Sequence, residues 1–254
     1  MIERRELLRK ARDKGLNLMI VEKDYILGWL MFGFSHEPNL VFKGGSALSK
    51  IYFPRIWRLS EDLDFSLVEG EFTDLQERLN SIFSAVRKRA GIEFGLKSHY
   101  LNPEYLQLKI QYDGIIGRNW IKIDVTKDDL VVKPVLKTIF KEYSDYVPFK
   151  IRVETLDEIF ASKLRAVIER KKCRDYFDLW KLSNMNFEMQ KIRRIFREKC
   201  KIKNIQFMGR NQIFPDDLFE TLKPYWEREL GRLINTTPDM VKVFNDLKKT
   251  LGFL

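Results

Sequence analysis

The sequence predicts an α/β (α+β) fold, in which a sheet flanked by helices is followed by a bundle of helices. In the first half, segments with the pattern of strands alternate with helical ones, whereas the pattern after residue 150 is helical almost to the end. The 254 residues are 44% hydrophobic, which is enough for a substantial core. We therefore expect two domains, residues 1–150 and 151–254, without a long linker between them.

The first half is expected to begin with one or two helices that pack on a sheet, because apolar residues recur at helical spacing before residue 35. A further helical stripe runs from Leu75 to Val86 and is ended by Gly91. Strands are indicated where β-branched and aromatic residues stand between Gly, Asn and Pro. The expected strands are residues 40–43, 62–68, 105–112 and 119–126.

The second half shows apolar periodicity typical of amphipathic helices. The apolar stripe of the first of them would continue to Lys171 and Lys172, so we expect that helix to break there. The expected helices lie near residues 155–169, 174–184, 187–200, 215–233 and 238–251.

Composition excludes several classes of function. The net charge of +10 favours a phosphate-bearing partner. The most apolar run, residues 25–34, is half of the ~20 residues that a membrane span needs, and no leader is recognisable, so a cytoplasmic protein is expected. Cys173 and Cys200 lack the spacing of a disulfide framework or zinc site, and two histidines leave little material for nucleophilic triads. Any chemistry should come from carboxylates and metal.

Paired carboxylates occur in the segment DLDFSL, residues 62–67. Alternate side chains of a strand share a face, so Asp62 and Asp64 point the same way. Two carboxylates about 4 Å apart repel by about 1 kcal/mol in water, and a divalent cation such as Mg²⁺ relieves that repulsion. In the same way, Lys122 and Asp124 share a face of the strand at 119–126. Three carboxylates on two strands suit two Mg²⁺ ions.

A glycine turn precedes the paired carboxylates. Gly44 and Gly45 let the backbone approach a ligand closely, and Ser46 opens a helix whose N-terminal N–H groups would face an anion. We interpret the turn as a phosphate site beside the metal. By itself, a pair of glycines is more often an ordinary turn, and a DxD pair is more often a solvated strand edge. Their occurrence together and in this order favours the functional interpretation.

The start of the helical half holds a second cluster of charges. Lys163 and Arg170 are seven residues apart and share a helical face, so they could reach a triphosphate; the alternative is a solvated basic edge. Asp175 and Asp178 lie one turn apart at the start of the next helix, where the helix dipole favours acids. Helix capping would explain one of them.

A basic segment at residues 191–210 suggests where a nucleic acid would dock. Arg193, Arg194 and Arg197 stand among apolar residues at helical spacing, so much of the basic set should be exposed on one side of a helix. This predicts an acceptor-binding face for RNA. A face that merely keeps the protein in solution is the alternative.

These motifs resemble those of a known family. The segment FKGGSALSKIY followed by RLSEDLDFSL resembles the nucleotidyltransferase toxins of the AbiEii/AbiGii type, in the DNA polymerase β-like nucleotidyltransferase superfamily, which includes the mycobacterial MenT toxins. The similarity continues in EKDYIL, IKIDV and LDEIFASKLRAVIERKKCRDYFDLW, in the same order over roughly residues 20–180. Ser46 stands where the family usually has threonine, and Leu59 where phenylalanine is commoner.

The resemblance implies a nucleotidyltransferase-type mixed sheet and a Mg²⁺-dependent enzyme that transfers a nucleoside monophosphate from an NTP to an acceptor. The acceptor that the basic segment predicts is RNA, such as the 3′ end of a tRNA. The resemblance implies a toxin from a family whose members commonly have a separate antitoxin, although a toxin that stands alone is the alternative. The residue roles that it implies are phosphate binding for Gly45 and Ser46, metal binding for Asp62 and Asp64, a third carboxylate at Asp124, and a later lysine and acid at Lys163 and Asp175.

Two other functions stay open at this level. A metal-dependent nuclease also uses clustered acids and a lysine, but its usual lysine follows the acid, whereas Lys122 precedes Asp124, and it does not need the glycine turn. A basic nucleic-acid-binding protein without activity would explain the charge, but three aligned carboxylates would repel a phosphate backbone. The nucleotidyltransferase explains all of these features.

Overall fold

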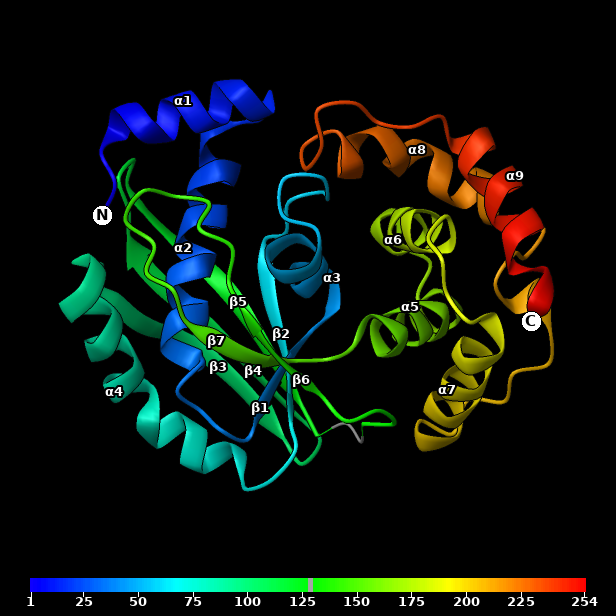
Figure 1. The fold of residues 1–254 in the computed structure, drawn as a ribbon, viewed down its shortest axis with the longest axis horizontal. Coiled ribbons are helices and arrows are strands. Elements are labelled where there is room, and N and C mark those ends of the chain that lie inside the picture. The colour runs from blue at the N-terminus through cyan, green and yellow to red at the C-terminus, as the bar shows by residue number, and fades with distance from the viewer. Residues whose placement is uncertain (128–129) are drawn as a thin grey trace. The chain divides into compact units, whose positions relative to one another are not determined.

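The computed structural model describes residues 1–127 and 130–254, and the chain divides into two compact units (Figure 1). The first unit contains residues 1–127 and Pro134–Glu154, and the second contains Leu130–Lys133 and Thr155–Leu254. Residue 150, the expected boundary, lies at the start of strand β7 (Lys150–Val153), which pairs with strand β1 (Leu40–Lys43). Because this strand is part of the sheet, the first unit continues to Glu154.

The described part of the first unit forms a seven-stranded sheet in the order β3-β4-β5-β2-β1-β7-β6. The pairs β2/β5 and β1/β7 are parallel and the others antiparallel, so the sheet is mixed, as expected. The remaining strands are β2 (Asp62–Leu67), β3 (Phe94–Asn102), β4 (Tyr105–Asp113), β5 (Arg118–Thr126) and β6 (Val135–Thr138). The helical segments of this unit are α1 (Arg4–Lys14), α2 (Leu18–Phe34), α3 (Gly44–Ala47), the π-helical η1 (Leu48–Tyr52) and α4 (Phe72–Ala90).

One face of the sheet forms the core of this unit. Leu63, Phe65 and Ile123 point to this face and are buried, and the ring of Phe34 in α2 stacks on Phe65 at a centroid distance of 5.6 Å. Helix α4 covers the same face near β3, where Phe83 contacts Phe94. The polar side chains at the alternating positions are thereby left on the opposite face of β2 and β5.

Three strands were not expected from the sequence. Strand β3 is at one edge of the sheet, and nearly all its residues are exposed, so it lacks the alternation of apolar and polar residues that marks a half-buried strand. Strands β6 and β7 have four residues each, which is too short for a periodic signal. The four expected strands are confirmed within a residue at each end.

The second unit is helical throughout its described elements, as expected. Its first two helices are separated by a break at Arg170–Lys172, which confirms the break expected at the two lysines. The elements are α5 (Leu156–Glu169), α6 (Cys173–Ser183), α7 (Met189–Ile202), η2 (Arg210–Gln212), α8 (Leu218–Leu230), α9 (Met240–Thr250) and η3 (Leu251–Phe253).

Cys173 and Cys200 are both buried and free, in agreement with a packing role. In residues 1–127 and 130–254, none of the helices combines the length and apolar character that a bilayer span requires.

Candidate active site

The two carboxylate pairs predicted from the sequence meet on one face of the sheet. Strand β2 runs parallel to β5, and the register places Asp62 opposite Lys122 and Asp64 opposite Asp124. Residues opposite each other in neighbouring strands share a face, so all four side chains lie on the same side. The alternating residues, such as Leu63 and Ile123, are fully buried on the other side and hold the two strands in this register.

Lys122 lies between the carboxylates. Its Nζ is 2.6 Å from Oδ2 of Asp124 and 3.9 Å from Oδ2 of Asp62. Partial burial lowers the pKa of Lys122, but the hydrogen bond to Asp124 and the negative charges of the three aspartates outweigh this effect, so the pKa is raised. The lysine therefore stays protonated and offsets part of the carboxylate repulsion.

Asp124 is held by two side chains of β4 that the sequence analysis did not single out. The hydroxyl of Tyr105 donates to Oδ1 of Asp124 at 2.6 Å, and Nε2 of Gln107 donates to the same oxygen at 3.2 Å. Burial and the charge of Asp124 raise the pKa of Tyr105, so its hydroxyl keeps its proton. Tyr105 and Gln107 alternate along β4 with Leu106 and Leu108, which are buried on the other face. This period-2 pattern in the sequence could have placed Tyr105 and Gln107 on the carboxylate face.

The glycine turn lies directly beside Asp64. Gly44 follows β1 and has φ +75°, a backbone conformation that residues other than glycine rarely adopt. A Cβ on Gly44 would lie 2.8 Å from Oδ2 of Asp64. Glycine is thus required here both by the backbone conformation and by the close carboxylate. The turn and the paired aspartates, separate in the sequence, form one cluster.

Ser46 is placed differently from what a phosphate-binding hydroxyl would require. Its side chain is fully buried, donates to the carbonyl oxygen of Asp62, and contacts the hydroxyl of Ser60 at 2.7 Å. The hydroxyl therefore ties the glycine turn to the start of β2. Any contact of this turn with a phosphate would have to come from its backbone.

A buried ion pair anchors the helical segment that follows the turn. Nζ of Lys50 in η1 is 2.6 Å from Oδ1 of Asp24 in α2, and the hydroxyl of Tyr143 donates to Oδ2 of Asp24 at 2.9 Å. Burial lowers the pKa of Lys50, while the charge of Asp24 opposes that shift. Asp24 belongs to the EKDYIL segment, so this motif anchors the helical segment that follows the glycine turn.

The oxygen atoms of Asp62 and Asp64 are the hard ligands that Mg²⁺ prefers. The position of Lys122 shows that positive charge is accommodated between Asp62 and Asp124. In the described residues, no three Asp, Glu, His or Cys side chains are arranged as a ready metal-binding group. The hydrogen bonds from Tyr105 and Lys122 engage both oxygens of Asp124. Carboxylate oxygens gathered on one face of two neighbouring strands fit the donor chemistry that Mg²⁺ requires.

Lys163, Arg170 and Asp175 come together in the second unit. Nζ of Lys163 is 2.8 Å from Oδ1 of Asp175 and 2.7 Å from Oδ2 of Asp178, and Nε of Arg170 is 3.0 Å from Oδ2 of Asp175. Lys163 and both aspartates are buried. Lys163 is therefore not on a solvated basic edge, because it is buried and pairs with two buried carboxylates. Asp178 pairs with this lysine, so neither aspartate is only a helix cap.

The charges around Asp175 perturb its titration. Burial raises the pKa of Asp175, but the positive charges of Lys163 and Arg170 and the hydrogen bonds from both outweigh burial. The pKa of Asp175 is consequently well below its usual range. This network joins α5 to α6 across the helix break.

The basic segment of α7 is partly exposed, as expected. Ile192, Ile195, Phe196 and Cys200 form its buried stripe. Lys199 does not belong to the exposed set, because it is buried and pairs with Glu158 at 2.6 Å. Arg194 and Arg197 are exposed and Arg193 is half-buried, and no ion pair joins any of these three arginines to a residue in the described part of the chain.

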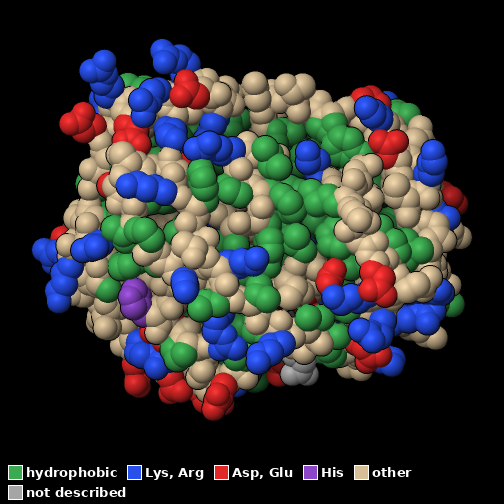
Figure 2. Space-filling model, in the orientation of Figure 1, with side chains coloured by type: hydrophobic (Ala, Val, Ile, Leu, Met, Phe, Trp, Pro, Cys, Tyr) green, Lys and Arg blue, Asp and Glu red, His purple; other side chains and the backbone are tan. Residues whose placement is uncertain are grey.

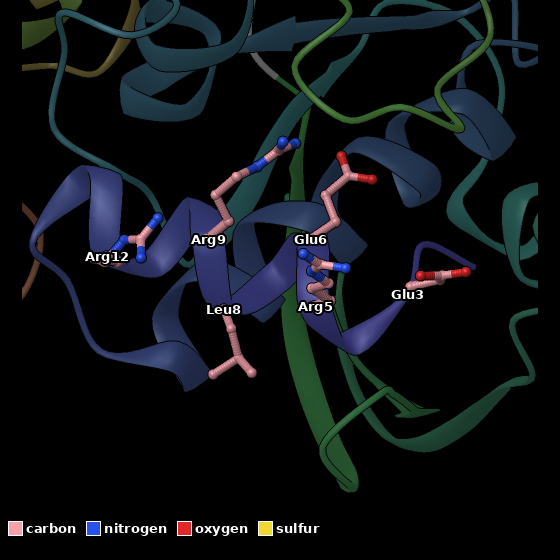
Figure 3. A pocket seen from close by; sticks show the side chains of 6 residues that line it. All are labelled: Glu3, Arg5, Glu6, Leu8, Arg9 and Arg12. Atoms are coloured by element: carbon pink, nitrogen blue, oxygen red, sulfur yellow. The ribbon is translucent and has the colours of Figure 1, made fainter.

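A surface cavity of about 690 Å³ lies on α1 and contains none of the predicted site residues. Figure 3 shows that the side chains around it project from this one helix and from Glu3, the residue just before it. A space bordered by one helix offers few converging groups, so it does not compete with the carboxylate cluster as an active site.

On the face drawn in Figure 2, basic side chains are spread over the surface with acidic ones among them, so the positive charge does not form a single patch there.

A mixed sheet with paired aspartates beside a glycine turn is the arrangement expected of a nucleotidyltransferase, and comparisons with known proteins agree. A family model described as "Nucleotidyl transferase AbiEii toxin, Type IV TA system" matches residues 29–250. The chain therefore belongs to the AbiEii nucleotidyltransferase toxin family and is a nucleotidyltransferase. The resemblance found in the sequence motifs is confirmed.

Solved structures show the same fold. MenT4, a nucleotidyltransferase toxin from Mycobacterium tuberculosis H37Rv, aligns with a TM-score of 0.73 and 19% identity over 100% of this chain and 89% of that chain. JHP933 from Helicobacter pylori aligns with a TM-score of 0.64 and 17% identity over 94% and 92% of the two chains. At these identities the likeness concerns the fold. No curated protein matches the sequence.

Proposed function

We propose that this protein transfers a nucleoside monophosphate from an NTP to the 3′ end of an RNA, with tRNA as the acceptor, in a Mg²⁺-dependent reaction. The observation that carries the proposal is the register of β2 and β5, which places Asp62 and Asp64 beside Asp124 and next to the glycine turn at Gly44. The shared face brings the groups expected to handle metal and phosphate within contact distance of one another.

The chain's own residues would divide the work as follows. The backbone of Gly44 and Gly45 would approach a phosphate of the NTP, and Lys122 would offset negative charge at the carboxylates. Tyr105 and Gln107 hold Asp124 in a fixed orientation. Fixed orientation matters because transfer requires the reacting atoms to be aligned before the reaction begins.

Asp62, Asp64 and Asp124 are the residues that we propose would hold Mg²⁺, in one or two ions. When bound, Mg²⁺ neutralises charge on the phosphates and lowers the pKa of an attacking hydroxyl. We assign Lys163 and Asp175 to the support of the helical unit, where their buried ion pair lies, and Arg170 is the partly exposed member of this network that could contact an anion.

The proposed docking site for the body of the RNA is the exposed face of α7. Arg193, Arg194 and Arg197 have no ion-pair partner among the described residues, which leaves their charges available to phosphates. Replacing all three by glutamine should flatten the dependence of log K on log salt by about two units, at about 0.7 to 0.9 for each phosphate contact. Normal RNA labelling with an unchanged salt dependence would place the RNA elsewhere.

The family description, a toxin of a type IV toxin–antitoxin system, supports two further proposals. The first is that a separate antitoxin protein counteracts this one. The second is that the protein acts in the cytoplasm, where NTP and tRNA are available. Expression alone should slow growth, and expression with the neighbouring gene should restore it.

Incubation with each labelled NTP, Mg²⁺ and total RNA tests the proposed reaction directly. Label transferred to RNA supports nucleotidyl transfer, whereas shortened RNA would indicate the nuclease and binding without either product would indicate a nucleic-acid-binding protein. Chelation of divalent ions should abolish the transfer, and added Mg²⁺ should restore it. Transfer that persists in the chelator would contradict the metal requirement.

A further inference from the structure

A cluster of lysines around a tryptophan lies on the carboxylate face of the sheet. The ammonium groups of Lys23, Lys97 and Lys109 lie 5.5, 5.8 and 5.4 Å from the centroid of the Trp120 ring. Trp120 is half-buried, and none of the three lysines forms an ion pair with a residue within 1–127 or 130–254. Three like charges around one ring repel one another, and the ring compensates them only weakly.

The backbone builds this cluster in two ways. Trp120 and Lys122 are alternate residues of β5, so Trp120 lies on the carboxylate face, roughly 7 Å along the strand from Lys122. Lys109, on the neighbouring strand β4, stands opposite Lys122 in the register of the two strands, so it shares the carboxylate face. In β3 the register shifts between Leu96, which opposes Ile110, and Ser98, which opposes Lys109.

Lys97 is the extra residue at this shift. Its neighbour Leu96 opposes Ile110, whose side chain is buried on the core face. Side chains alternate along a strand, so Lys97 is directed to the carboxylate face, where its ammonium lies near the Trp120 ring. The bulge leaves Lys97 without an opposing residue on β4.

We propose that Trp120, Lys23, Lys97 and Lys109 form the binding site for the single-stranded end of the acceptor RNA. A base would stack on the indole, and the lysines would pair with the flanking phosphates, the combination by which proteins hold single-stranded nucleic acids. An ammonium group whose contact is with an aromatic ring is weakly restrained. A nucleic-acid base can therefore displace a lysine from the indole, and the displaced lysine can then pair with a phosphate.

The order of the strands supports the acceptor rather than the NTP as the occupant. Asp62 and Asp64 are on β2, which lies between β1 and β5. The glycine turn that follows β1 is on one side of the carboxylates, and Trp120 in β5 is on the other. Transfer between two substrates requires the reacting centre to lie between them. This inference rests on the proposed nucleotidyl transfer, with the NTP phosphates at the glycine turn.

Direct binding of a labelled single-stranded oligouridylate to the full-length protein, without NTP, tests the site. Trp120→Ala should weaken binding about 5- to 150-fold, the usual effect of losing one stacked base, whereas Trp120→Phe should retain most of it. Quenching of tryptophan fluorescence by the oligonucleotide should be smaller in Trp120→Phe than in the wild type. Binding of ATP alone should be unchanged in both variants.

A pair of matched charge variants separates specific contacts from net charge. Lys97→Gln/Lys109→Gln should reduce the slope of log K against log salt by about 1.4, at about 0.7 for each contact to a single strand. Lys88→Gln/Arg89→Gln removes the same charge from exposed positions of α4, which covers the other face near β3, and should leave the slope unchanged.

Equal oligouridylate binding by the wild type and Trp120→Ala, or weaker ATP binding with normal oligonucleotide binding, would overturn the assignment. The first result would leave the cluster without this ligand, and the second would assign it to the donor nucleotide. Because these assays measure binding without catalysis, they stay interpretable if the wild type transfers no nucleotide. In that case the proposed function fails, whereas the binding site is judged by its own measurement.

Discussion

The ammonium of Lys122 lies 2.6 Å from Oδ2 of Asp124, which itself stands in register with Asp64 on the neighbouring parallel strand. This contact shows how the protein holds several carboxylates on one face without a large cost from their electrostatic repulsion. The lysine supplies a positive charge, and Tyr105 supplies a hydrogen bond to the other oxygen of Asp124. The same lysine also lies 3.9 Å from Oδ2 of Asp62, so it contributes to the charge balance of both strands.

Removal of either paired carboxylate should abolish nucleotide transfer. Asp62→Asn and Asp64→Asn keep the size of the side chain but remove the charge that we assign to metal binding. The free energy of unfolding should change by less than about 1 kcal/mol, because exposed or half-buried charges contribute little. Transfer of labelled NTP and urea denaturation measure the two effects.

A matched control for this experiment is Asp113→Asn, which removes an exposed carboxylate at the end of β4 that pairs with Arg118. This variant should retain full transfer. Full activity in Asp62→Asn or Asp64→Asn would contradict the central assignment of the site.

Gly44→Ala should lose activity by displacing Asp64. The new Cβ would lie 2.8 Å from Oδ2 of that carboxylate, whose flexible end can move aside. The loss of stability should therefore be modest, about 1 kcal/mol from the positive φ, while transfer falls much further. Thermal unfolding and the rate of labelled nucleotide transfer, measured on the same preparation, separate the two effects.

Gly91→Ala provides the control for backbone strain. Gly91 has φ +67°, close to the +75° of Gly44, but a Cβ there would meet nothing within 4 Å. The two variants should be destabilised to a similar extent, and only Gly44→Ala should be inactive. Similar activities in both would show that the contact with Asp64 is unimportant for the reaction.

Lys163→Met should destabilise the second unit by about 3–5 kcal/mol, because it leaves the buried carboxylates of Asp175 and Asp178 without their shared cation. Equilibrium unfolding in urea measures this loss. A triple variant, Lys163→Met/Asp175→Asn/Asp178→Asn, removes both carboxylate charges together with the lysine and should recover part of the stability. Wild-type stability in the single variant would argue for a role in ligand binding instead.

Acid should destabilise the protein partly through Asp175. A carboxyl whose pKa is lowered on folding contributes stability above its unfolded pKa, about 3.9, and that contribution disappears as the pH falls through the lower, folded pKa. Below pH about 3.9, this group alone should reduce the free energy of unfolding by up to about 1.4 kcal/mol per pH unit. Urea titrations at a series of acid pH values should show a shallower decline in Asp175→Asn than in the wild type.

Asp113 offers a contrasting case. The hydrogen bond and charge of Arg118 lower the pKa of Asp113, but this pair is exposed to solvent. Its contribution to the pH dependence should vanish in high salt, whereas that of the buried Asp175 should persist. A salt-sensitive contribution from Asp175 would mean that water reaches the ion pair.

Local patterns predicted the elements with strong periodicity. The alternation in DLDFSL correctly placed Asp62 and Asp64 on one face, because the pleat of a strand separates neighbouring side chains whatever the strand packs against. The stripes of α4 and α7 predicted their buried faces for the same local reason. Strand β3 was missed, because exposure on both faces removes the pattern on which such predictions depend.

Short-range patterns and motifs were enough to predict the family, the fold class, the helices of the second unit and the groups that we propose to bind metal and phosphate. Which of these groups come into contact depends on the folded chain. Pairing of β2 with β5, about sixty residues apart, sets Lys122 between two aspartates, and packing of α5 against α6 buries Lys163 beside Asp175. Such contacts depend on strand register and helix packing, which bring together residues far apart in the chain and therefore leave no local signal in the sequence.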